Sequence, residues 1–64
     1  MGIKSEIERI QGFVDTGNYH AAINITLSAI NECRRNNDHV GIDKFIVIIR
    51  GIIDTLAGEL GSSS

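Results

Sequence analysis

Apolar residues recur every three or four positions along almost the whole chain, and no proline interrupts them. This spacing is typical of amphipathic α-helices, in which residues three and four apart share one face. Glycines and small polar residues divide the pattern into three segments. The sequence therefore predicts an all-α fold, a single three-helix domain over residues 1–60, followed by a flexible C-terminal tail over residues 61–64.

The first segment carries aliphatic residues at alternating steps of four and three, namely Ile3, Ile7, Ile10 and Val14. Ser5 and Glu8 fit a capping box, which places the regular start of this helix at Ser5. The helix is expected to end at Thr16–Gly17, because glycine readily adopts the left-handed conformation that follows many helices. Asn18 is then a candidate N-cap for the second helix.

The second helix is expected to run from about Tyr19 to Arg35, and it is apolar on two sides. One stripe consists of Tyr19, Ile23, Leu27, Ile30 and Cys33, and the other of Ala22, Ile25 and Ala29. Together they are wider than the single stripe of a surface helix, so this helix is expected to lie between the other two. Asp38 is a candidate N-cap for the third helix.

The third helix is expected to begin at His39 or Gly41 and to end at Leu60. Phe45–Ile49 taken alone would suggest a β-strand. However, the helical stripe continues on both sides of it, through Ile42, Phe45, Ile46, Ile49, Ile52, Ile53, Leu56 and Leu60. This unbroken period favours a helix.

The third segment also repeats the first at a constant offset of 39 residues. Ile3, Ile7 and Ile10 align with Ile42, Ile46 and Ile49, and the Gly and Asp-Thr positions of Gln11–Thr16 recur in Arg50–Thr55. A period of this length is typical of helical hairpin repeats. A coincidence between two amphipathic patterns is the alternative.

Gly17-Asn18-Tyr19-x-x-Ala22-Ile23, followed by Ala29-Ile30 and Glu32, resembles the turn and second helix of a tetratricopeptide repeat. The resemblance implies an antiparallel helical hairpin with Tyr19 at its corner. Ala22 and Ala29 would let the paired helix approach closely. A remoter likeness is to the three-helix MIT-type modules, which bind short helical motifs.

Composition argues against several functional classes. The net charge of −2 provides no basic field for nucleic acid, and the longest purely apolar run, Phe45–Ile49, is too short to span a membrane. Cys33, His20 and His39 fit no structural zinc spacing, and neither histidine has an evident catalytic partner. We therefore expect a cytoplasmic, non-enzymatic protein without a catalytic, cofactor or metal site, and a buried, inert Cys33.

The third helix has more apolar surface than one interface needs. Val47 and Ile48, together with Gly51 and Gly58, are the candidate self-association residues, because a face of valine and glycine lets another backbone come close. A chain of 64 residues has a marginal core, so we predict a homodimer or higher homo-oligomer. A partner helix could also lie in a groove between the first and third helices.

The predicted function is that of a small protein–protein interaction module, an adaptor or regulator acting through helical surfaces and self-association on a partner of unknown identity. The alternative is a small regulator, of the kind found in phages and plasmids, that contacts DNA or RNA through a basic corner. That corner would consist of Arg34, Arg35 and Lys44. A third possibility, a redox or hydrolytic enzyme, depends on Cys33 alone.

Overall fold

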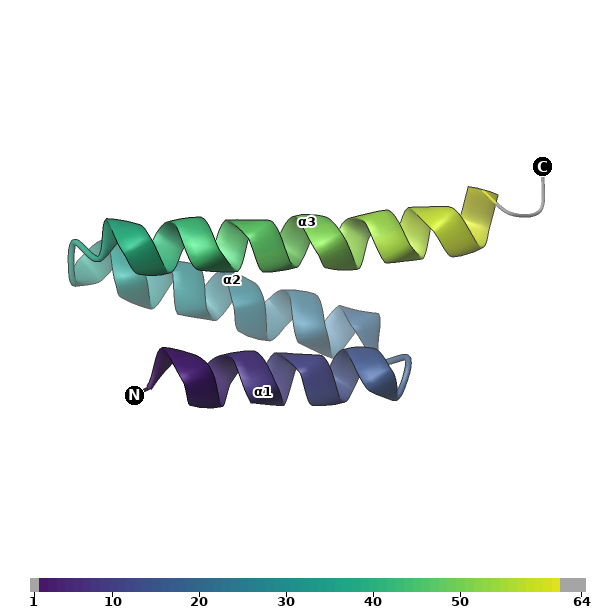
Figure 1. Cartoon of the computed structure of the whole chain (residues 1–64), viewed down its shortest axis with the longest axis horizontal. Coiled ribbons are helices and arrows are strands. Elements are labelled where there is room, and N and C mark those ends of the chain that lie inside the picture. Colours follow the sequence, from purple (N-terminus) through teal and green to yellow (C-terminus); the bar gives the residue numbers. More distant parts are fainter. Residues whose placement is uncertain (1, 62–64) are drawn as a thin grey trace.

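In the computed structural model, which describes residues 2–61, three α-helices are joined by two short turns (Figure 1). Helix α1 spans Ile3–Asp15, α2 spans Tyr19–Arg35 and α3 spans His39–Gly61. The expected all-α fold is therefore confirmed, and the run Phe45–Ile49 is helical.

Two expected boundaries are wrong by one or two residues. Helix α1 begins at Ile3 rather than Ser5, because the extended backbone of Gly2 (φ −92°, ψ 134°) serves as its N-cap. The Gly2 carbonyl accepts the first helical hydrogen bond, from the backbone N–H of Glu6 at 3.1 Å. Helix α3 includes Gly61, which was assigned to the tail. The remaining tail residues, 62–64, lie outside the described part of the chain.

The turn after α1 is a Schellman motif. Gly17 adopts the left-handed conformation (φ 79°), as expected. Its N–H donates to the Val14 carbonyl at 3.0 Å, and the N–H of Asn18 donates to the Phe13 carbonyl at 2.8 Å. The Asn18 side chain then accepts the N–H of Ala21 at 3.3 Å, which confirms Asn18 as the N-cap of α2.

The turn after α2 has the same hydrogen-bond pattern, with Asn37 (φ 54°) in the left-handed position. The N–H of Asn37 donates to the Arg34 carbonyl at 3.1 Å, and that of Asp38 donates to the Cys33 carbonyl at 2.8 Å. The Asp38 carboxylate accepts the N–H of Gly41 at 3.0 Å, so Asp38 caps α3 as predicted. Each turn therefore ends one helix and caps the next within three residues.

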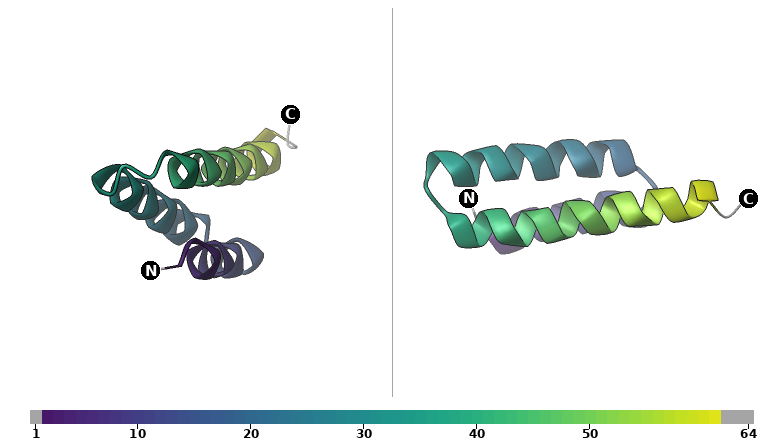
Figure 2. Two further views of the ribbon diagram at one scale, coloured as in Figure 1. Left: turned by 60° about the vertical axis from the view of Figure 1, so that its left-hand side comes forward. Right: turned by 90° about the horizontal axis from the view of Figure 1, so that it is seen from above.

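The three helices form a single curved layer. Helices α1 and α3 each pack against α2 and make little contact with each other. In the left view of Figure 2, α2 lies at the apex of a V whose two arms are α1 and α3. The Cα positions span 42 × 18 × 14 Å, and a flat row of three helices would be wider and thinner than this, so the layer is strongly bent. Helix α2 is thus apolar on two sides because a helix lies on each.

The core follows the inner face of α2. Its buried residues are Ala22, Thr26, Ala29 and Cys33 from α2, Ile10 from α1, and Phe45 and Ile52 from α3. The two alanines are among the most deeply buried of these residues, at 0% and 3% exposed. The Thr26 hydroxyl is satisfied because it donates to the Ala22 carbonyl at 2.7 Å. A Cβ at buried Gly41 would lie 2.7 Å from the Cys33 sulfur, so α3 starts close against the end of α2.

The apolar stripe of α3 is continuous along the helix but only partly buried. Ile46 and Ile53 are 39% and 50% exposed, and Leu27 on α2 is 47% exposed. Helix α3 packs mainly against one helix, so the arc that α2 covers is narrower than the apolar arc of α3. The Leu60 side chain lies outside the described part of the structure.

Candidate interaction groove

A groove of about 330 Å³ lies between α1 and α3. Helix α1 contributes Ile7, Ile10, Gln11 and Val14, and helix α3 contributes Val47, Ile48, Gly51, Ile52 and Thr55. Six of these nine residues are isoleucine or valine, so the lining is predominantly apolar. Such a surface suits the apolar face of another helix better than it suits a polar metabolite.

Three of the four predicted self-association residues meet in this groove. Val47, Ile48 and Gly51 form much of its α3 side. Gly58 is exposed and lies two turns beyond Gly51 on the same face of α3, outside the groove lining.

The α1 side of the groove was not predicted residue by residue. Ile7, Gln11 and Val14 share one face of α1 at helical spacing, a signal visible in the sequence. Only the placement of α1 beside α3 shows that this face lines a groove.

Val47 is the most exposed large apolar side chain of the described residues, at 69%. One turn further along α3, a Cβ built on Gly51 would meet nothing within 4 Å. At the edge of the groove, the protruding side chain of Val47 thus lies one turn from Gly51, where there is space for another side chain. Exposed apolar surface of this kind generally marks an interaction site.

Polar groups along the groove are satisfied within their own helices. The Gln11 side-chain amide donates to the Asp15 carboxylate at 2.8 Å. The Thr55 hydroxyl donates to the Gly51 carbonyl at 2.9 Å. Each of these groups can keep its local hydrogen bond when an apolar side chain approaches the groove.

Charged side chains lie near both ends of the groove. Helices α1 and α3 run in the same direction (Figure 1), so the positive ends of their dipoles lie together. Lys4 precedes Ile7 by about one turn, and Lys44 precedes Ile48 by about one turn, near those N-terminal ends. Asp15 and Asp54 lie toward the opposite end. Glu8 and Asp43 lie within about one turn of Lys4 and Lys44, so the side-chain charges at that end are mixed.

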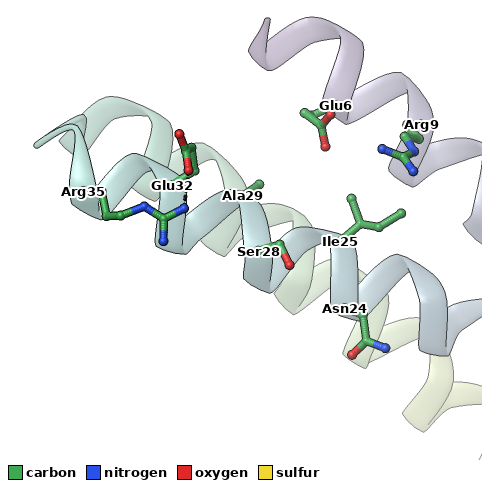
Figure 3. Close-up of a pocket in the computed structure, with 8 residues that line it drawn as sticks. All are labelled: Glu6, Arg9, Asn24, Ile25, Ser28, Ala29, Glu32 and Arg35. Atoms are coloured by element: carbon green, nitrogen blue, oxygen red, sulfur yellow. Dashed lines mark hydrogen bonds and ion pairs between the residues drawn. The ribbon is translucent and has the colours of Figure 1, made fainter. Parts of the chain in front are cut away.

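A second hollow, of about 390 Å³, lies between α1 and α2 (Figure 3). Its lining consists of Glu6, Arg9, Asn24, Ile25, Ser28, Ala29, Glu32 and Arg35. Two carboxylates balance two guanidinium groups, and Glu32 forms an ion pair with Arg35. The Arg35 side chain lowers the pKa of Glu32 by hydrogen bonding and by its charge. Without a net charge, this hollow carries no preference for an ionic ligand.

The predicted basic corner is distributed over different faces. Arg34 and Arg35 line a shallow depression on α2 together with Asn31. Arg35 is engaged by Glu32, and Lys44 lies on the groove side of α3, away from that depression. These three side chains do not form one continuous basic surface.

The candidate reactive residues lie apart from the groove lining. His20 and His39 are exposed, and Cys33 is buried, as expected. Within residues 2–61, no three His, Cys, Asp or Glu side chains are placed to hold a metal ion together. Burial, together with the charges of Asp38 and Glu32, raises the pKa of the Cys33 thiol.

Cys33 is predicted to resist alkylation and to weaken the fold at high pH. A raised thiol pKa means that the folded state holds the proton more tightly than the unfolded state. The stabilisation that the protonated thiol provides is fully present below the thiol pKa of the unfolded chain, about 8.5. It is lost as pH rises through the higher thiol pKa of the folded chain. At pH 8.5, iodoacetamide should modify native protein at least roughly a hundredfold more slowly than urea-unfolded protein.

Mass spectrometry over time measures this alkylation. In Cys33→Ala, the loss of stability between pH 8 and pH 9.5 should be smaller than in the unmodified chain. The hydrogen bond to Glu59 also raises the pKa of the Tyr19 phenol, but a phenol loses its proton at higher pH than a thiol. Equal alkylation rates for native and unfolded protein would contradict a buried thiol.

Comparison of the chain with protein-family models, curated proteins and solved structures gives no match. No described helix combines the length and hydropathy needed to cross a membrane. Function is therefore inferred from the geometry of the chain itself.

Proposed function

We propose that this protein is a non-enzymatic interaction module that takes up an amphipathic helix in the groove between α1 and α3. The apolar lining offers contacts to side chains spaced three and four apart on such a helix. The protein would act as an adaptor or small regulator. The likeness of Gly17–Ile23 to a tetratricopeptide hairpin supports the same assignment.

The observation that carries this proposal is the exposure of Val47 beside an apolar groove. Val47 is 69% exposed, although Ile48 and Ile52, its neighbours in the lining, are half-buried and buried. A covering helix would remove this apolar surface from water, which favours association by about 25 cal/mol per Å². The separation of Arg34, Arg35 and Lys44 gives less support to binding of DNA or RNA.

Two glycines at equivalent repeat positions provide a matched test of the groove. Gly12 and Gly51 are separated by the 39-residue offset, and a Cβ at either would meet nothing within 4 Å. Glutamine at either position should therefore fit the free protein and favour its helix by roughly 0.5 kcal/mol. Only Gly51→Gln places a long side chain in the groove.

The experiment selects binders from a displayed library of 18-residue amphipathic helices and measures their affinities by titration. Selected helices should bind the unmodified chain and Gly12→Gln equally, and Gly51→Gln at least roughly tenfold more weakly. Thermal unfolding should show both variants to be at least as stable as the parent. Failure to select any helix, or equal binding to Gly51→Gln, would refute the proposed function.

A further inference from the structure

We infer that the helix taken up at this groove is α3 of a second copy of the chain, in an antiparallel, twofold-symmetric pair. Each α3 would lie across the mouth of the groove of the other copy. This inference rests on the proposed function and names the partner of the same site. Steric fit, charge and area each support it.

The steric fit comes from the spacing of two valines and two glycines. Val40, Val47, Gly51 and Gly58 lie within about 40° of arc on α3, on the side opposite buried Phe45. The valines are 65% and 69% exposed. A Cβ at either glycine would meet nothing within 4 Å. This face therefore offers two protruding side chains and two open positions.

One register satisfies all of these positions. The valines are seven residues apart, and so are the glycines. In an antiparallel pair that places Val47 opposite Gly51 of the second copy, Val40 therefore lies opposite Gly58 of that copy. Twofold symmetry repeats both contacts. Each valine would fill an open position left by a glycine.

Charge complementarity points to the same arrangement. In an antiparallel pair, the numbers of residues at the same level add up to a constant, which is 98 when Val47 lies opposite Gly51. Lys44 then lies at the level of Asp54 of the second copy. Both side chains are exposed. Opposed helix dipoles favour the antiparallel pair as well.

The available area is enough for a weak, specific dimer. From Val40 to Gly58, α3 extends about 27 Å at 1.5 Å per residue. A strip of that length and two helices wide covers roughly 500 Å² on each copy, or about 1,000 Å² in total, which reaches the lower limit for specific interfaces. We expect dissociation in the micromolar range.

Three other exposed apolar side chains, Leu27 on α2 and Ile46 and Ile53 on α3, are the competing place for a second copy to bind. They have apolar exposure but offer no comparable open glycine positions, because Gly51 and Gly58 point elsewhere on α3. A dimer formed through these side chains is one outcome of the test below.

Sedimentation velocity of the full chain tests the location of the pair. The unmodified chain and Gly12→Gln should move from 7.0 kDa toward twice that mass as concentration rises through the micromolar range. Gly51→Gln should raise the dissociation constant at least roughly tenfold. Dimerisation unaffected by Gly51→Gln but lost in Leu27→Ser/Ile46→Ser would place the contact on the competing side chains and overturn the inference.

A charge exchange tests the register and direction of the pair. Lys44→Glu and Asp54→Lys should each weaken dimerisation, because each sets like charges opposite one another in the twofold pair. The double variant should restore it, since the exchanged charges again meet across the interface. Failure of the double variant to recover would overturn the antiparallel register, because a parallel pair would set position 44 opposite itself.

Failure of the dimer can be told apart from failure of the proposed function. A chain that stays at 7.0 kDa up to about 1 mM, the weak limit of specific association, overturns the second-copy inference. Helices selected from the library would still bind that monomer if the groove is an interaction site. Monomeric protein that also binds no selected helix would refute both.

Discussion

Replacing Phe45 with alanine is expected to leave much of the protein unfolded at 25 °C. Phe45 is fully buried and is the largest of the fully buried side chains in the described structure. Its truncation removes contacts with α2 and leaves a cavity, at a cost of about 3–5 kcal/mol. A 64-residue chain has a total stability of only roughly 3–10 kcal/mol.

Circular dichroism at 222 nm during urea titration measures the loss. Phe45→Leu is the matched control, because it retains most of the apolar volume and should cost roughly 1.5 kcal/mol or less. Titrations at low micromolar concentration or below separate folding from association. A loss below about 1 kcal/mol in Phe45→Ala would contradict the placement of this ring in the core.

Replacing Ile10 with alanine is expected to cost about 2–5 kcal/mol and to loosen α1 first. Ile10 is the buried residue of α1, only 1% exposed, and α1 is held mainly by its packing against α2. A helix of 13 residues is marginal in water once it loses tertiary contacts. Undocking of α1 should therefore also unwind it.

Hydrogen exchange of the α1 amides measures this loosening, and it should precede exchange in the middle of α2. Ile53→Ala is the control, since the same atoms are removed from a side chain that is 50% exposed. Its cost should be no more than about half that of Ile10→Ala. Equal costs would show that Ile10 does not anchor α1 as the structure indicates.

Local features of the fold were predictable because neighbouring residues determine them. The bounds Tyr19–Arg35 and the caps Asn18 and Asp38 were predicted correctly, since cap and turn geometry depend on a few adjacent residues. The start of α1 was misplaced because the Gly2 backbone caps the helix. No capping side chain marks this position in the sequence.

Features that depend on how helices are arranged were harder to predict. Periodicity placed Ile46 and Ile53 on the apolar side of α3 but could not show how narrow an arc α2 covers. Val47, Ile48 and Gly51 stood out because they depart from the core stripe. Their neighbours across the groove, Ile7 and Val14, resemble ordinary core residues in sequence, so they could be recognised only from the fold.

The two three-residue turns also determine how much binding costs. At each turn one residue, Asn18 or Asp38, both closes a Schellman motif and caps the next helix, so the connections have little freedom to rotate the helices. The separation of α1 and α3 is then set before any helix arrives. A groove that is already shaped loses little conformational entropy when it is filled. The ordering cost falls mainly on the incoming helix, which favours a partner that is already folded.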